Sequence, residues 1–260
     1  MNKDLVTVII TSYNKKKFIK RSIQSALNQT YKTKEVIVFD DKSSDGSTNI
    51  IKNIKNIKFF INKKKINKSN PLNQLSAILK CIKKSRGKYI FLLDGDDYFK
   101  KKKIEHFLRY FNENHNINVI QDKPFITEKK KILHLKKKNH FFSIWPSIYP
   151  TSTIAIRKHF FIEFINFIER NKYPNLEIDS RLVMYANLKN KLKVLNKSYT
   201  FYNTDPKGIS SKYKKFSKLW WKKRNEAFDY LQYLYRKLGK KFYKGFDYFI
   251  TKFIMLFVNR

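Results

Sequence analysis

Three carboxylates follow a run of apolar residues in the stretch FLLDGDDYF. Asp94, Asp96 and Asp97 fall within four positions, although the chain has only 20 acidic residues against 57 basic ones. Neighbouring carboxylates repel each other unless a positive charge offsets them, and a hard divalent cation with oxygen ligands is the usual partner. Gly95 lets the backbone turn tightly enough for Asp94 and Asp96 to face one space. The pattern favours a Mg²⁺ or Mn²⁺ site; the alternative is that Asp96 or Asp97 caps the following helix.

A second acidic turn, DDKSSDGS, begins with Asp40 and Asp41 and follows another apolar run. Asp, Ser and Gly are common turn formers, so Asp45 or Ser47 could simply cap the next helix. Two carboxylates at the end of a buried strand are more than a turn needs. In dinucleotide-binding folds, an acidic residue at such a place accepts hydrogen bonds from the ribose. The turn therefore favours nucleotide binding.

The elements that would position these turns alternate between apolar runs and helical patterns over the first 120 residues. We expect strands at residues 6–11, 35–40, 57–62 and 88–94, and helices at 16–29, 46–54, 70–85 and 101–114. Apolar runs without alternation, such as VTVIIT, are typical of strands buried on both faces. This repetition predicts an α/β fold with a mostly parallel sheet flanked by helices. The acidic turns, and Thr11 to Asn14 after the first strand, should share the rim where such sheets bind ligands.

The second half of the chain is less regular. Residues 121–150 predict strands and loops, residues 152–170 a strand turning into a helix, and residues 176–188 another helix. The segment KLKVLNKSYTFYN, residues 191–203, resembles a short hairpin. From about Ser210, apolar side chains recur at three- and four-residue steps, which predicts a C-terminal helical extension.

Taken together, these motifs resemble the inverting glycosyltransferase family 2, which has the Rossmann-like GT-A fold. The resemblance rests on Ser-Tyr-Asn after the first strand, SALNQTY at the end of the first helix, the double-Asp turn and Asp-Gly-Asp-Asp, in that order. It is close over residues 5–110 and looser to about residue 210. It implies a GT-A domain over residues 1–208, with a nucleotide-sugar-binding half (1–120) and an acceptor half (121–208), and a basic aromatic helical extension over residues 209–260.

The resemblance also implies roles for individual residues. Asp94 and Asp96, with Asp97 beside them, would hold a Mn²⁺ or Mg²⁺ ion and the ribose of a nucleotide-sugar. The nucleoside pocket would be lined by Thr11, Tyr13, Asp40 and Asp41. The metal would bridge the two phosphates and neutralise charge on the departing diphosphate. The family often supplies a third metal ligand from a late histidine; all five histidines here lie at or before His159, so that ligand is missing or is another residue.

Asp179, in LEIDSRLVMYA, is the general base that the resemblance implies. Family members usually carry Glu-Asp at this place, with Leu three residues on and often Arg six residues on. Leu182 matches, but Ile178 precedes Asp179 and Tyr185 replaces the arginine. Glu177 is the next candidate base, and a plain acidic residue at a helix N-terminus is the structural alternative. As base, Asp179 would take a proton from an acceptor hydroxyl that attacks the anomeric carbon in one inverting displacement.

The formal charge of +37, from 48 Lys and 9 Arg against the acids, leaves the partner of the protein open. It indicates attraction to nucleic acid, a membrane surface or a phosphorylated substrate, or else drift toward A/T-rich codons. The sequence has no zinc-finger spacing and no RNA-recognition signature, so no nucleic-acid partner is expected. Two alternative functions stay open: a basic nucleic-acid-binding protein on a nucleotide-binding fold, and a sugar-nucleotide nucleotidyltransferase. The absence of a Gly-rich loop after VTVII argues against the second.

Location follows from three features of the sequence. The single cysteine, Cys81, excludes an internal disulfide and fits a reducing cytoplasm. No run reaches the roughly 20 apolar residues that span a bilayer, and Val6 to Thr11 is too short for a signal peptide. Residues 206–260 hold 15 bases and 3 acids with interleaved aromatic residues. That composition is typical of contact with an anionic membrane surface; the alternative is that these helices pack on the catalytic domain.

We therefore expect a cytoplasmic enzyme, peripheral at the inner face of the cell membrane. It would move a hexose or N-acetylhexosamine from a nucleotide-sugar to a saccharide or lipid-linked saccharide acceptor. Uridine diphosphate is the expected leaving group because it is the commonest in the family. The product would belong to a cell-surface polysaccharide or glycolipid.

Overall fold

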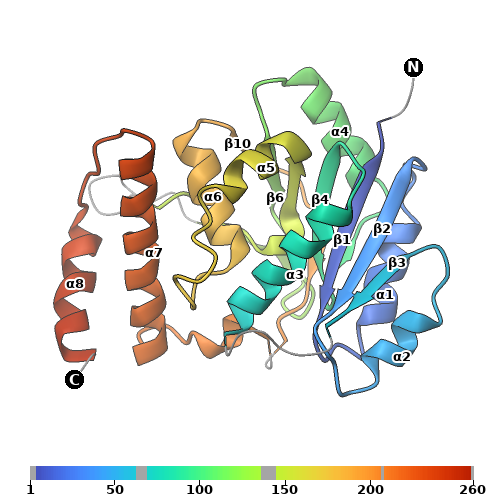
Figure 1. Cartoon of the computed structure of the whole chain (residues 1–260), viewed down its shortest axis with the longest axis horizontal. Coiled ribbons are helices and arrows are strands. Elements are labelled where there is room, and N and C mark those ends of the chain that lie inside the picture. The colour runs from blue at the N-terminus through green and yellow to red at the C-terminus, as the bar shows by residue number, and fades with distance from the viewer. Residues whose placement is uncertain (1–3, 63–68, 136–144, 206–207, 259–260) are drawn as a thin grey trace.

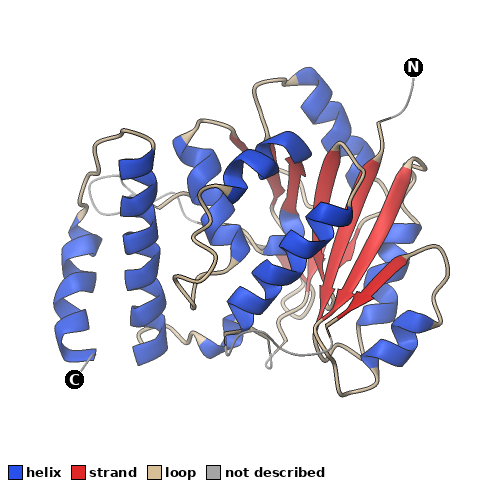
Figure 2. Cartoon of the chain, in the orientation of Figure 1, coloured by secondary structure: helices blue, strands red, loops and turns tan. Residues whose placement is uncertain are grey.

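A seven-stranded sheet forms the centre of the protein, in the order β10-β6-β9-β4-β1-β2-β3 (Figures 1 and 2). The computed structural model describes residues 4–62, 69–135, 145–205 and 208–258. The strands are β1 (Val6–Ser12), β2 (Lys34–Asp40), β3 (Lys58–Ile61), β4 (Tyr89–Asp94), β6 (Val119–Asp122), β9 (Ile154–Arg157) and β10 (Leu192–Leu195). Strands β1 to β4 are parallel, and β9 runs antiparallel to β4 and β6. The expected mostly parallel α/β sheet is confirmed.

Helices cover both faces of this sheet (Figure 2). They are α1 (Ile19–Leu27), α2 (Ser47–Lys52), α3 (Asn70–Lys84), α4 (Lys103–Glu113), α5 (Lys158–Ile165) and α6 (Ile178–Leu188). Two buried clusters result, one shared with α1, α2 and α4 and the other with α3, α5 and α6. Strand β1 contributes Val8 and Ile10 to the first cluster and Ile9 to the second. Burial on both faces explains why its sequence is apolar without alternation.

Strand register brings the polar turns to one edge of the sheet. Thr11 of β1 lies beside Asp94 of β4, and Ser12 lies beside Asp40 of β2. Because β1, β2 and β4 are parallel, the loops that follow them leave the sheet on the same side. The expectation that the three turns share one rim is confirmed.

A second, four-stranded sheet has the order β5-β11-β7-β8. Its strands are β5 (Tyr98–Phe99), β7 (Phe125–Ile126), β8 (Lys131–Ile132) and β11 (Thr200–Tyr202). The hairpin expected at residues 191–203 is wrong, because β10 pairs with β6 while β11 pairs with β5 and β7. Asp122 at the end of β6 explains the separation, since it accepts hydrogen bonds from the backbone N–H of Tyr199 and from Thr200 Oγ1. These bonds draw the chain away from β10.

Two helices form the C-terminal part, α7 (Lys218–Lys237) and α8 (Phe246–Val258). The sequence pattern predicts helix from about Ser210, but α7 begins at Lys218, with Ser217 as its N-cap. Apolar residues of α7 belong to the same buried cluster as α3, α5 and α6. Helix α8 packs on α7 at the outer edge of the molecule (Figure 1). No helix in the described part of the chain is long and apolar enough to cross a membrane.

Candidate active site

A cavity of about 750 Å³ opens at the rim where β1, β2 and β4 end. We call it the rim cavity. The predicted site residues that line it are Thr11, Tyr13, Asp41, Asp94, Asp96 and Asp179. Two further predicted residues, Asp40 and Asp97, do not line it. Most of the candidate residues therefore surround one space, although they come from both halves of the chain.

Asp94, the last residue of β4, carries a carboxyl that faces this cavity. Its Oδ1 accepts hydrogen bonds from Gln74 Nε2 at 2.7 Å and from Thr11 Oγ1 at 3.3 Å. Burial raises the pKa of Asp94 to about 7, and the negative charges of Asp96 and Asp179 add to the shift. Several carboxylates therefore share this buried point of the rim, and negative charge gathered in this way favours binding of a cation.

Lys15 supplies one positive charge, from the loop after β1. Its Nζ donates to Asp96 Oδ2 at 2.5 Å and to Asp205 Oδ2 at 2.6 Å. Burial lowers the pKa of Lys15, but the two carboxylates outweigh burial and the net shift is upward. Asp205 was not predicted, because nothing in the sequence around it separates it from an ordinary turn acid. It reaches the cavity because the chain leaves β11 toward the end of β4.

Asp97 has a different position from its two neighbours. Its carboxylate accepts hydrogen bonds from Ser152 Oγ at 2.5 Å and from the backbone N–H of Asn203 at 2.9 Å, and its side chain is buried. Burial and the charges of Asp96 and Asp94 raise the pKa of Asp97 well above its usual value. Ser152 Oγ also accepts the backbone N–H of Asp94 at 3.0 Å. The carboxylate of Asp97 therefore lies behind the rim, outside the cavity lining.

In the double-Asp turn, too, one carboxylate is buried behind the rim and the other lines the cavity. Asp40 is fully buried and accepts hydrogen bonds from Ser43 Oγ and Thr48 Oγ1, each at 2.5 Å, which fix the turn into α2. Asp41 lines the rim cavity and accepts a hydrogen bond from Asn62 Nδ2 at 2.7 Å. Asp41 is accordingly the carboxylate of this turn that can meet a ligand.

Asp179 lies in the first turn of α6 and lines the rim cavity from the second half of the chain. Its Oδ1 accepts a hydrogen bond from the backbone N–H of Ser180 at 2.5 Å, and its Oδ2 accepts one from Thr151 Oγ1 at 3.4 Å. Burial raises the pKa of Asp179 to about 6, with the charge of Glu177 as the next cause. A carboxylate with this pKa is ionised at neutral pH and still accepts a proton well, as a general base must.

Glu177 also lines the cavity, but it is paired with a cation. Its carboxylate lies 2.5 Å from Lys223 Nζ of α7. Lys223, Ser211 and Lys212 all line the rim cavity. The C-terminal part of the chain thus contributes to the site, a contribution that the expected division at residue 208 did not include.

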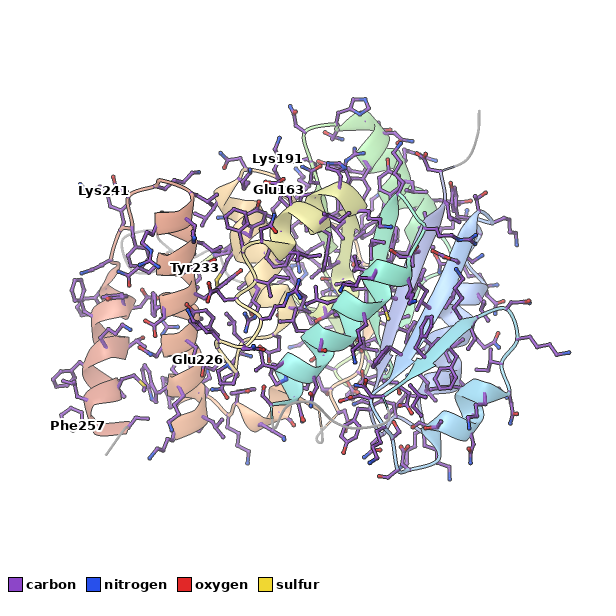
Figure 3. The ribbon with its side chains drawn as sticks, in the orientation of Figure 1. Glu163, Lys191, Glu226, Tyr233, Lys241 and Phe257 are labelled. Carbon is purple, nitrogen blue, oxygen red and sulfur yellow. The ribbon has the colours of Figure 1, made fainter. Side chains whose placement is uncertain are left out.

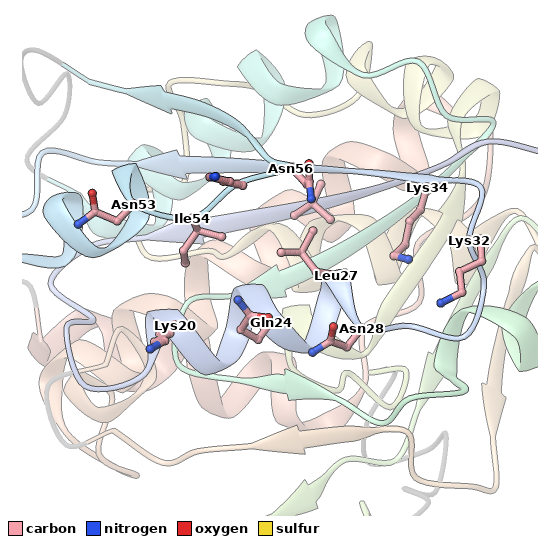
Figure 4. A pocket seen from close by; sticks show the side chains of 11 residues that line it. Lys20, Gln24, Leu27, Asn28, Lys32, Lys34, Asn53, Ile54 and Asn56 are labelled. Atoms are coloured by element: carbon pink, nitrogen blue, oxygen red, sulfur yellow. The ribbon is translucent and has the colours of Figure 1, made fainter.

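A second cavity, of about 570 Å³, lies between α1, the start of β2 and the loop after α2 (Figure 4). The described residues that line it include the lysines Lys20, Lys32, Lys34 and Lys55 but no carboxylate. It therefore offers positive charge without a general base. The rim cavity, which is lined by carboxylates from the end of the sheet and from α6, is the candidate active site.

The arrangement of potential ligands bears on metal binding. Among the described residues, no three Asp, Glu, His or Cys side chains form a group ready to hold a metal ion. Asp96 and Asp205 instead share the ammonium of Lys15, while Asp94 accepts its hydrogen bonds from the neutral groups of Gln74 and Thr11. Carboxylate oxygens are the ligands that Mg²⁺ and Mn²⁺ prefer. The carboxylates therefore fit such an ion once Lys15 no longer pairs with Asp96 and Asp205.

Comparison with known sequences gives a family match over much of the chain. The model described as Glycosyl transferase family 2 matches residues 7–176. The chain is 36% identical over 108 residues to UDP-Glc:alpha-D-GlcNAc-diphosphoundecaprenol beta-1,3-glucosyltransferase WfaP of Escherichia coli, covering 41% of each protein. It is 32% identical over 111 residues to the putative teichuronic acid biosynthesis glycosyltransferase TuaG of Bacillus subtilis, covering 43% of each. The matched region is less than half of these relatives.

Solved structures share the fold. Residues 1–349 of TarS from S. aureus, in complex with UDP-GlcNAc, match with a TM-score of 0.62 and 17% identity, over 86% of this chain and 66% of that one. The mannosyltransferase PcManGT from Pyrobaculum calidifontis, in complex with GDP-Man and Mn²⁺, matches with a TM-score of 0.58 and 11% identity, over 88% and 64%. At these identities the likeness shows the GT-A fold alone.

Proposed function

Because the chain belongs to glycosyl transferase family 2, we propose that its rim cavity transfers a sugar from a nucleotide-sugar to an acceptor hydroxyl. One observation carries the proposal. Asp179, whose pKa is about 6, faces the same cavity as the carboxylates of Asp94 and Asp96. A general base in the same cavity as carboxylates that can bind a cation is the arrangement that a direct displacement at the anomeric carbon requires.

The donor is proposed to bind through its nucleoside at the end of the sheet. Thr11, Tyr13 and Asp41 line this part of the cavity, and the carboxylate of Asp41 can accept hydrogen bonds from a ribose or a base. A uridine diphosphate sugar is the proposed donor. Its support is the name of WfaP, which uses UDP-glucose, and the UDP-GlcNAc complex of TarS.

Asp94 and Asp96 are proposed to hold Mn²⁺ or Mg²⁺, with Asp205 as a third carboxylate ligand. The support is the cluster of carboxylates at this rim, where the charges of Asp96 and Asp179 add to burial in raising the pKa of Asp94, and the ammonium of Lys15 that Asp96 and Asp205 already share. When bound, the ion would neutralise negative charge on the diphosphate. Asp97 keeps the backbone of Asp94 and Asp96 in place through Ser152 and Asn203.

Asp179 is proposed to act on the acceptor. Its carboxylate takes the proton of the acceptor hydroxyl while the oxygen forms a bond to the anomeric carbon. The bond between that carbon and the diphosphate oxygen breaks, so the nucleoside diphosphate leaves and the configuration inverts. Ser180 and Thr151 orient the carboxylate through the hydrogen bonds described above. The ion pair with Lys223 makes Glu177 a weaker candidate for this role.

The acceptor is proposed to be a saccharide or lipid-linked saccharide in the synthesis of a cell-surface polysaccharide or glycolipid. WfaP is named for a diphosphoundecaprenol-linked acceptor and TuaG for teichuronic acid biosynthesis. The transferred unit would be a hexose or an N-acetylhexosamine. Such an acceptor would place the enzyme in the cytoplasm, at the inner face of the cell membrane.

Substitution of Asp179 tests the proposal. Asp179→Asn should lower turnover by about 10²-fold or more, because the amide cannot take a proton. Affinity for UDP-glucose or UDP-GlcNAc should stay nearly unchanged, since the base acts on the acceptor. Release of UDP gives turnover, and calorimetry gives affinity. Glu113→Gln, at an exposed position of α4 outside the cavity, is the matched control. Near-normal turnover of Asp179→Asn would contradict the assignment and direct attention to Glu177.

A further inference from the structure

Helix α8 exposes most of its large apolar side chains, whereas its two buried side chains are those of Thr251 and Met255. Five large apolar side chains, of which Leu256 and Phe257 are adjacent and the others lie three or four residues apart, are more than half exposed: Phe246 (57%), Phe249 (55%), Phe253 (62%), Leu256 (66%) and Phe257 (60%). We call these residues the outer face of α8. A surface helix usually turns its apolar stripe toward the protein core. On α8 most of the large apolar side chains point outward instead, and contiguous exposed apolar surface of this kind marks an interaction site.

Polar contacts hold the helix in this orientation. Asp247 forms an ion pair with Arg224 of α7 at 2.6 Å and accepts a hydrogen bond from Trp145 Nε1 at 3.0 Å. Arg224 Nε donates to Thr251 Oγ1 at 2.9 Å. Lys252 pairs with Asp229 of α7 at 2.6 Å. Rotating α8 to bury its phenylalanines would break all of these contacts, so the exposed stripe is specified by the fold.

The figures show where this face lies. Helix α8 is the outermost element of the molecule, with α7 between it and the sheet (Figure 1). The side chain of Phe257 points away from α7 into open space (Figure 3). At 13 residues, α8 is too short to span a bilayer but long enough to lie along its surface.

Charge selects the kind of partner. Asp247 is the one acidic residue of α8, and it faces α7. Lys241 and Lys244 are exposed in the connection before α8, and Lys218 is exposed at the start of α7, near the opposite end of the stripe. An apolar stripe with basic residues at both ends complements an anionic lipid surface. A second copy of the chain would bring like charges together.

We propose that the outer face of α8 docks on an anionic lipid bilayer. The phenylalanines enter the boundary between headgroups and acyl chains, while Lys241 and Lys244 contact the headgroups. This inference goes beyond sugar transfer, because it rests on the exposure and charge of α8 and holds whatever the rim cavity binds.

Vesicle co-sedimentation with the 260-residue chain tests the proposal. The probes are vesicles of phosphatidylcholine alone and of phosphatidylcholine with about 40% phosphatidylglycerol, in about 50 mM NaCl. We expect binding to the anionic vesicles at least about tenfold tighter than to the neutral ones. The double variant F253S/F257S should bind at least about tenfold more weakly. Ile162→Ser is the matched control, because Ile162 is 52% exposed but lies on α5.

A second variant separates charge from apolar contact. K241E/K244E leaves the apolar face intact and should lower binding to anionic vesicles at least about tenfold, with no change for neutral ones. Thermal unfolding checks that all variants keep the wild-type Tm, as exposed positions should. Wild-type protein that does not bind anionic vesicles, or F253S/F257S protein that binds as well as wild type, would overturn the proposal. So would a dimer, seen by sedimentation, that F253S/F257S dissociates, because a second copy would then cover this face.

Discussion

Asp94 keeps a carboxyl whose pKa is about 7 in the folded protein, against about 3.8 in its ordinary state. Burial is the main cause, followed by the charges of Asp96 and Asp179. Between these two pH values the unfolded chain releases the proton and the folded chain keeps it. The free energy of unfolding therefore falls as pH rises from about 4 to about 7, and this loss persists above pH 7.

Asp94→Asn should remove that loss. At pH 8 in the presence of a chelator, we expect the variant to be about 1–2 kcal/mol more stable than wild type. At pH 4 the two proteins should be equally stable, because the wild-type carboxyl is then neutral in the folded state. Urea unfolding at both pH values measures the difference. A variant that is equally stable, or less stable, at pH 8 would show that burial does not hold the pKa of Asp94 high.

Asp96 is the residue at which metal binding can be tested directly. If Asp96 holds Mn²⁺ with Asp94, Asp96→Asn should weaken UDP binding in Mn²⁺ by about tenfold or more. With a chelator present, the variant and wild type should bind UDP alike. Calorimetry provides both affinities, and Glu113→Gln, at an exposed position of α4, serves as a control away from the cavity. Wild-type affinity that is equal with Mn²⁺ and with chelator would rule out the metal role.

At the scale of the element, α6 depends on an arginine that bonds to backbone carbonyls. Arg181 is fully buried, and its guanidinium donates to carbonyl oxygens of the chain between α5 and α6. The closest acceptors are the carbonyl oxygens of Ile168 (2.5 Å), Lys172 (2.7 Å) and Tyr173 (2.8 Å). These bonds fix the approach to α6 and so the place of Asp179 in the rim cavity.

Arg181→Met should be strongly destabilising, because methionine fills part of the space but leaves several buried carbonyls without donors. We expect the free energy of unfolding to fall by about 3 kcal/mol or more. Arg236→Met is the matched control, since Arg236 is exposed on α7, and its effect should be close to zero. Urea unfolding of both variants provides the comparison. Similar stability of the two would mean that the carbonyls find other partners.

The charge of the whole molecule leads to a prediction about salt. With 57 basic residues and 20 acidic ones, the compact state suffers more repulsion than the extended chain. Raising NaCl from about 50 to about 500 mM should increase the free energy of unfolding by about 1 kcal/mol, because salt screens exposed charges. KCl at the same concentrations should increase the free energy of unfolding by the same amount, because screening depends on ionic strength. K55E/K129E, at two exposed positions, should reduce the effect. Stability that falls with added salt would contradict this account.

Membership of glycosyl transferase family 2 supports the proposed sugar transfer over the two other functions that the composition left open, nucleic-acid binding and nucleotidyl transfer. The tertiary structure adds that α7 belongs to the site as well as to the core. Lys223 of this helix lines the rim cavity and pairs with Glu177. The rim cavity therefore depends on packing between parts of the chain that the sequence assigned to different units.

Much of the fold was predictable because periodicity is local. Apolar runs determined β1, β2 and β4, and the turns that follow them had to meet once those strands were parallel. The sequence pattern alone was therefore enough to bring Asp41, Asp94 and Asp96 together. Asp179 joined them through the family resemblance, since its own surroundings in the sequence do not separate it from a plain acidic residue at a helix N-terminus.

Only the tertiary structure decided which carboxylates face the cavity and which support it. Asp40 and Asp97 turn to partners that come from their own turn or from distant loops, and neither contact has a signature in local sequence. Lys15 meets Asp205 across 190 positions. The separation of β10 from β11 and the outward face of α8 have the same origin. Hydrogen bonds and ion pairs between distant segments depend on how the elements pack. The periodicity of apolar residues along the chain therefore does not predict them.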